Sequence, residues 1–370
     1  MSGATSGIHA ANSLASVLAA SASLQAQQST LQEQSTTGLI SQNYAGVGVQ
    51  ASQILDLSAT SAQSNTYTQV ITAGQGQASA MQDALGQIGT LTSAMATQAL
   101  QLTNSAAELS VSSVAQQAQQ ELQQLSSLLN TQYAGNYVFA GADTSNPPVT
   151  DPGSITSSGL YTQIGTAMSG LGATPVASII ASTVSSAAST AAGTSIFSTY
   201  LTTPAPNTPS GTPGGLGAAG RQIAIGEGQT VSLDYPANQN TNAVSDPSIN
   251  GTGSAMNDIL GGLAILAHAT TSMSTTADFA TVMQHVATTL ASANQTITQE
   301  ASALGNVQDT LTTASTSQSS LQTLLKGQIS DLTNVDMAST ISNMTAVNNQ
   351  LQTSYQVLAM AKSLNLASFL

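Results

Sequence analysis

A seven-residue apolar repeat runs through most of the chain's C-terminal stretch, from Phe279 to Leu370. It comes in two registers separated by a short break near Asn334. The first contains Met283, Leu290, Ile297, Leu304 and Leu311, and the second contains Met337, Met344, Leu351 and Leu358. This spacing places the side chains on one narrow stripe of an α-helix, which only a helix lying alongside can cover. The repeat therefore predicts long helices packed along other helices.

The N-terminal stretch from Ile8 to Leu39 offers a matching stripe, and Gly38 is predicted to end its helix. Isolated helices are marginal in water, so we expect the two ends of the chain to pair with each other. We expect their remaining faces to bind neighbouring subunits. The predicted self-assembly residues are Leu14, Val17, Leu24, Leu31, Met337, Ile341, Met344, Leu351, Tyr355, Leu358, Phe369 and Leu370.

Helical spacing also extends from Ile54 to Leu129, with weak points predicted at Gly74, Gly76 and Asn104. Residues 137–139 then resemble a short strand. The predicted fold is mainly α: a long antiparallel helical rod with paired N- and C-terminal coiled-coil helices and an inserted, mostly β and irregular outer domain. The predicted segments are 1–43, the N-terminal coiled-coil helix; 44–140 and 254–333, the two halves of the rod; 141–253, the insertion; and 334–370, the C-terminal coiled-coil helix.

The insertion differs from its flanks in composition. All ten prolines of the chain fall within it, and proline breaks helices, so the long helices must stop there. Short helices are predicted at 164–171 and 176–192. Alternating apolar residues on either side of Gly226-Glu227-Gly228 predict a β-hairpin over 222–235.

The charge content excludes several classes of function. Only 5% of the residues are charged, against roughly 25% in typical soluble domains, and the basic ones are Arg221, Lys326 and Lys362. With a net charge of −13, binding to nucleic acid or to an anionic membrane is not expected. The chain has no cysteine, no apolar run long enough to span a membrane, and no basic residue before its apolar stretch at 14–22. We therefore expect no cleaved signal peptide.

Catalytic, cofactor and metal sites are not expected either. His9, His268 and His285 are dispersed along the chain, and no serine lies in a Gly-x-Ser-x-Gly turn. The Gly-x-Gly pairs at 46–48 and 74–76 lack the third glycine of a nucleotide-binding loop. Asp331 and Asp336 are predicted to cap helices, since both lie near the start of the last helical run. These features indicate a structural protein.

Several short motifs, in order from both termini, resemble the flagellin family, and within it the hook-filament junction proteins, also called hook-associated protein three. The matching stretches are LQEQSTTG at 31–38, ASQILDL at 51–57, GNYVFAG at 135–141, LQTSYQ at 351–356 and SLNLASFL at 363–370. Family members usually carry a basic residue after the first motif, whereas Leu39 follows Gly38 here.

The resemblance implies an extracellular, non-enzymatic flagellar subunit without cofactors, exported through the flagellar type III apparatus with an export chaperone. It also implies helical stacking with copies of itself and contact with hook-associated proteins and flagellin. Two other interpretations stay open: a flagellin that forms the filament itself, and a secreted adhesin or enzyme on a helical stalk. With so few charges, we expect assembly to depend little on salt or moderately acidic pH.

Overall fold

The structure is a computed structural model that describes residues 3–104, 108–202, 221–233, 235–238 and 251–367. Within these ranges, the side chains of residues 3–14, 104, 108–110 and 361–367 are not described. The fold is mainly α, as predicted. Its longer helices are α1 (Gly3–Thr37), α2 (Ala51–Asn104), α3 (Glu108–Leu129), α7 (Ala255–Ala267), α8 (Phe279–Thr333) and α9 (Met337–Ala367). The shorter helices are α4 (Gly159–Ser169), α5 (Val176–Ala187) and α6 (Thr199–Thr202), with 3-10 turns η1 (Tyr44–Gln50), η2 (Pro152–Ser157) and η4 (Met273–Thr275).

The chain divides into two compact units. Unit 1 comprises Met1–Asn65 and Ser320–Leu370, and unit 2 comprises Thr66–Ser319. The helices α2 and α8 each contribute to both units, and each unit is described separately below.

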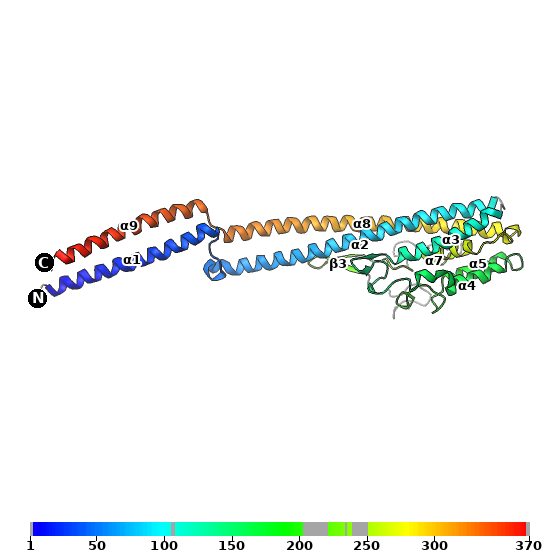
Figure 1. Cartoon of the computed structure of the whole chain (residues 1–370), viewed down its shortest axis with the longest axis horizontal. Helices are drawn as coiled ribbons and strands as arrows, with labels where there is room; N and C mark the ends of the chain where they lie inside the picture. Colours follow the sequence, from blue (N-terminus) through cyan, green and yellow to red (C-terminus); the bar gives the residue numbers. More distant parts are fainter. Residues whose placement is uncertain (1–2, 105–107, 203–220, 234, 239–250, 368–370) are drawn as a thin grey trace. The chain divides into compact units, whose positions relative to one another are not determined.

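In unit 1, α1 and α9 pack side by side in antiparallel directions (Figure 1). Two backbone hydrogen bonds tie together the turns at their inner ends: Ile40 N–H donates to Thr333 O at 2.7 Å, and Val335 N–H donates to Gly38 O at 2.9 Å. Gly38 adopts a left-handed conformation, φ +74°, directly after α1 ends at Thr37. The predicted helix end at Gly38 is therefore confirmed.

The break near Asn334 is a true interruption, because α8 ends at Thr333 and α9 begins at Met337. Asp336 caps α9: its carboxylate accepts hydrogen bonds from Ala338 N–H at 2.9 Å and from the Ser339 hydroxyl at 2.7 Å. The prediction that Asp331 also caps this helix is wrong. Asp331 lies in the last turn of α8, before the break, and so belongs to the helix that ends there rather than to the one that begins after it.

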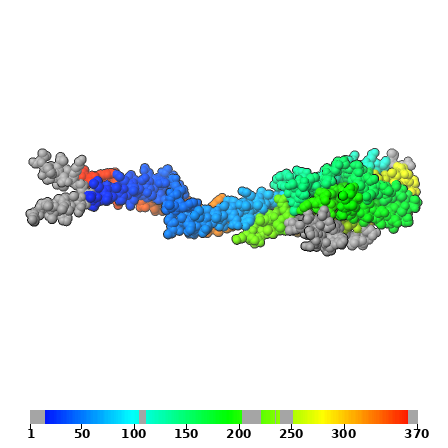
Figure 2. Space-filling view, turned by 90° about the horizontal axis from the view of Figure 1, so that it is seen from below, coloured from blue at the N-terminus to red at the C-terminus, as the bar shows by residue number. Residues whose placement is uncertain are grey.

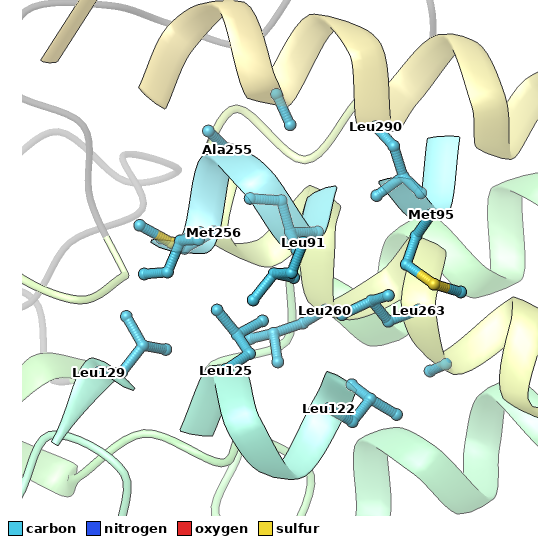
Figure 3. Packing of buried hydrophobic residues seen from close by; sticks show 14 of the residues in the cluster. Leu91, Met95, Leu122, Leu125, Leu129, Ala255, Met256, Leu260, Leu263 and Leu290 are labelled. Atoms are coloured by element: carbon cyan, nitrogen blue, oxygen red, sulfur yellow. The ribbon is translucent and has the colours of Figure 1, made fainter. Parts of the chain in front are cut away.

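In unit 2, α2 and α8 lie antiparallel, with α3 and α7 packed beside them (Figure 1). The first register of the seven-residue repeat is buried along α8, as predicted; its members are Met283, Leu290, Ile297, Leu304 and Leu311. Every residue of α7 is buried, and apart from Asn257 and Asp258 near its start all of them are apolar or glycine. Figure 3 shows the core at this point, with Leu91 and Met95 from α2, Leu122, Leu125 and Leu129 from α3, and Leu260 and Leu263 from α7.

Two small antiparallel hairpins complete unit 2. Strands β3 (Gln222–Gly226) and β4 (Gln229–Ser232) pair with Ile223 opposite Val231, which confirms the predicted hairpin. This β3–β4 hairpin lies on the surface beside α2 (Figure 2). A hydrogen bond connects it to α8, in which the Gln318 amide donates to Ile225 O at 3.0 Å. Strands β1 (Gln132–Tyr133) and β2 (Asn136–Tyr137) form the other hairpin. The predicted strand at 137–139 is thus shorter and lies earlier, because Phe139 turns into the core against Tyr235.

The predicted weakening of the helix at Gly74 and Gly76 is wrong, since α2 continues through both. Tertiary packing explains these glycines. A Cβ at Gly74 would clash with the Ile223 side chain of the hairpin, and one at Gly76 would clash with the Tyr133 ring. Their lack of a side chain allows both hairpins to approach α2 closely. The helix does end at Asn104, where a break was predicted.

Candidate self-assembly surface

The contact between α1 and α9 follows one stripe on each helix, here called the seam. Its members are spaced alternately three and four residues apart, which is the spacing of a coiled-coil contact. They are Val17, Ser21, Leu24, Gln28 and Leu31 on α1, and Thr340, Met344, Val347, Leu351, Ser354 and Leu358 on α9; all are buried or half-buried. The seven-residue stripes of the two termini therefore face each other within one subunit.

The seam is thin and partly polar. Ser21 and Thr340 occupy buried positions, and the Gln28 amide donates to Asn348 Oδ1 across the helix pair at 2.6 Å. At its edge, the Gln25 amide donates to the Tyr355 hydroxyl at 2.7 Å. A fully buried leucine stabilises a fold by roughly 1.5 to 3 kcal/mol, and polar positions contribute much less. A seam with so few leucines leaves the helix pair with little stabilisation of its own.

Exposed apolar side chains also lie on both flanks of the seam, and together they are here called the outer face. Ile341 is 48% exposed and Tyr355 is 47% exposed, although each directly follows a seam residue in the sequence. The outer face consists of Leu18, Met337, Ile341, Tyr355, Val357 and Met360. The twelve predicted residues are therefore divided by the fold: the seam takes Val17, Leu24, Leu31, Met344, Leu351 and Leu358, and the outer face takes Met337, Ile341 and Tyr355.

A groove of about 460 Å³ opens between α1 and α9 beside the seam. Its apolar lining comes from Val17, Ala20, Leu24 and Val357, and polar side chains from α9 complete it. The predicted residues Phe369 and Leu370 lie outside the described residues, and the side chain of Leu14 is not among those described.

The helix pair is almost uncharged. In sequence, α1 contains one charged residue, Glu33, and α9 contains one, Lys362. Hydrogen bonds from the Ser339 hydroxyl and the Ala338 N–H lower the pKa of the capping Asp336 carboxyl. This surface can therefore bind through apolar contact and neutral hydrogen bonds, with little electrostatic contribution.

The turn η1 connects α1 to α2, and no binding role was predicted for it. Asn43 caps it by accepting a hydrogen bond from Gly46 N–H at 3.0 Å, and Gly48 has a positive φ of +63°. This tight path leaves Tyr44 half-exposed and Val49 96% exposed. Tyr44 and Val49 stand at the two ends of a short stretch that contains two glycines. This pattern was the signal in the sequence that could have indicated an additional contact surface.

The two described histidines serve the fold of unit 2. His268 follows α7, where its Nδ1 donates to Ala264 O at 2.8 Å and its ring contacts Tyr161 at a centroid distance of 4.0 Å. Burial lowers the pKa of His268 and of His285. Among the described residues, no three histidine, cysteine, aspartate or glutamate side chains gather as a metal site would require. No helix in the described ranges has the length and apolarity of a membrane span.

Comparison with known proteins gives one family match. Residues 287–370 match the model of the bacterial flagellin C-terminal helical region. This range contains most of α8, the break at Asn334 and all of α9. The matched range is less than a quarter of the chain, and it shows that this part is similar to the C-terminal helical region of bacterial flagellins. No curated protein matches the chain.

Proposed function

We propose that this chain is the hook-filament junction subunit of a bacterial flagellum, and that it assembles through the outer face and groove of its α1–α9 pair. The observation that carries the proposal is the position of the family match. It covers α9, the helix that supplies one side of the seam and most of the outer face. The stretch at 135–141, GNYVFAG, favours the junction protein over a filament flagellin.

The energetic case rests on the thin seam. Each apolar side chain of the outer face that becomes fully buried on assembly contributes roughly 1.5 to 3 kcal/mol. Ile341, Tyr355 and Met360 are each large enough to supply this gain. Contacts between different surfaces of identical subunits, when they do not close into a ring, generate a helical stack. Assembly then completes the ordering of both terminal helices.

The same role implies partners beyond copies of the chain. A junction subunit contacts hook-associated proteins on one side and flagellin on the other, and it reaches them through the flagellar export apparatus with a chaperone. A chain without cysteine suits this route, because it can fold after export without forming disulfides.

Electron microscopy of cells lacking the protein tests the proposal. A junction role predicts hooks without filaments and filament protein shed into the medium. Loss of the major filament protein itself would instead identify the chain as flagellin, the alternative that the matched family model favours equally. Normal flagella in these cells would contradict both roles and would favour an adhesin or enzyme on a helical stalk.

A further inference from the structure

A small cavity lies inside unit 2 where α5 of the insertion meets α7 and α8. Its walls come from three helices and the segment before α7: Thr183, Val184 and Ala187 of α5, Asp258, Gly261, Gly262 and Ile265 of α7, His285, Val286 and Thr289 of α8, and Thr252. The cavity has a volume of about 20 Å³. A space of roughly 10 to 15 Å³ or more, measured this way, is enough for one water molecule.

Glycines of α7 line this space and allow the neighbouring helices to approach closely. A Cβ at Gly261 would lie 3.0 Å from the Cβ of Ala187, so α5 and α7 meet there without an intervening side chain. At Gly262, a Cβ would lie 2.8 Å from Leu290 Cδ2, so α7 and α8 are equally close. Small residues thus bring the helices together and leave the space between them unfilled by side chains.

Thr289 presents a polar group to this cavity. Its side chain is only 6% exposed, and no described group forms a hydrogen bond with its hydroxyl. Other threonines on α8 satisfy their hydroxyls locally: Thr288 donates to Gln284 O at 2.9 Å, and Thr296 donates to Ser292 O at 3.3 Å. Thr289 does not use the corresponding carbonyl four residues earlier, although a buried hydroxyl without a partner is destabilising.

Two further polar groups border the same space. The buried Asp258 carboxylate accepts a hydrogen bond from Thr252 N–H at 2.6 Å through Oδ1, and a carboxylate has acceptor capacity for several donors. His285 adds an imidazole from α8. A buried water molecule typically needs two to four polar partners, and the cavity supplies that number.

We propose that this cavity binds one water molecule, held by the Thr289 hydroxyl, the Asp258 carboxylate and the His285 imidazole. A metal ion fits less well, because the described lining provides one carboxylate and one imidazole as its strong ligands. The water joins α7 to α8 through hydrogen bonds where α5 of the insertion covers them. The contact of the insertion with α7 and α8 thus contains one buried water molecule.

The substitution Thr289→Val tests the proposal, because valine keeps the shape of threonine and removes only the hydroxyl. If water is bound, the variant loses one hydrogen bond, and the opening equilibrium constant of α7 and α8 rises about threefold to tenfold. Native-state hydrogen exchange of the full-length monomer measures this constant. The matched control is Thr296→Val, on the same helix and equally buried, whose hydroxyl bonds to its own helix.

The proposal requires a larger increase for Thr289→Val than for Thr296→Val. An unchanged or lower constant for Thr289→Val would overturn it, since removing a truly unpartnered buried hydroxyl stabilises a protein. A high-resolution crystal structure gives a second, independent result. Density for a water within hydrogen-bond distance of Thr289 Oγ1, lost in the valine variant, supports the site, and a wild-type cavity without such density contradicts it.

Discussion

His268 and His285 link the stability of unit 2 to pH. Burial holds the pKa of each imidazole below its ordinary value, although the Asp258 carboxylate partly opposes this effect at His285 and the Ala264 carbonyl does so at His268. Tyr161 is the other titratable group in contact with His268. In the folded state both rings stay neutral at pH values where the unfolded chain, with histidine pKa values of about 6.5, takes up protons.

We therefore expect unit 2 to lose stability as the pH falls below about 6.5. The unfolded state binds more protons than the folded state in this range, so stability rises with pH. Urea unfolding at pH 5.5 and 7.5 should give a lower midpoint at the acid value. The double variant His268→Gln/His285→Gln should reduce this difference, and an unchanged difference would show that other groups cause it.

Glycines of α2 have opposite roles depending on their surroundings. Gly74 faces the buried Ile223 side chain, with which a Cβ would clash, whereas a Cβ at Gly86 would meet nothing within 4 Å. Alanine favours a helix over glycine by about 0.5 to 1 kcal/mol. The two positions thus separate helix propensity from packing on the same helix.

Gly86→Ala should stabilise unit 2 by about 0.5 to 1 kcal/mol, through propensity alone. Gly74→Ala should destabilise it, because overpacking costs about 1 to 3 kcal/mol and exceeds the propensity gain. Thermal or urea unfolding of both variants measures the difference. Equal stabilisation by the two substitutions would mean that the hairpin yields freely at Ile223.

At the scale of elements, α9 has two kinds of surface: the seam packs against α1 within the subunit, and the outer face is proposed to bind neighbouring subunits. Leu351 is 4% exposed within the seam, whereas Ile341 is 48% exposed, two turns and more away on the same helix. Truncating a buried leucine costs about 2 to 5 kcal/mol, while truncating an exposed residue costs the free subunit little. Substitutions at Leu351 therefore test folding of the α1–α9 pair, and substitutions at Ile341 test assembly of subunits.

Leu351→Ala should destabilise the α1–α9 pair in the free monomer, seen as lost helical circular dichroism. Ile341→Ala should leave the monomer spectrum unchanged and raise the subunit concentration needed for polymerisation, measured by sedimentation. Ser342→Ala, an exposed polar neighbour, is the control and should do neither. If Ile341→Ala polymerises like the wild type, this part of the outer face lies outside the assembly contact.

At the scale of the whole molecule, the scarcity of charge governs how subunits can interact. The chain has three basic residues against sixteen acidic ones, and α1 and α9 contain one charged residue each in sequence. Ion pairs therefore contribute little to any contact made by these helices. Salt screens ion pairs strongly and affects neutral hydrogen bonds much less.

Polymer length should accordingly change little between low and molar salt, at a pH near 7.5 where unit 2 is stable. Electron microscopy or light scattering of assembled protein measures this dependence. Steep depolymerisation as salt rises would show that ion pairs hold the subunits together. A mild gain in length at high concentrations of an excluded salt such as sulfate remains compatible with apolar contacts.

The sequence by itself determined the periodic features of this protein. Seven-residue stripes at both termini, the glycine after Thr37 and the alternation on both sides of Gly226 specify their elements locally, because each depends on backbone geometry or on one face of one element. Only the tertiary structure decided which faces meet. Met337 follows the same spacing as Leu351, yet one is exposed and the other buried, because the partner helix covers only part of the stripe. Gly74 and Thr289 likewise acquire their roles from Ile223 and from the cavity under α5, segments far away in the sequence that no local pattern connects.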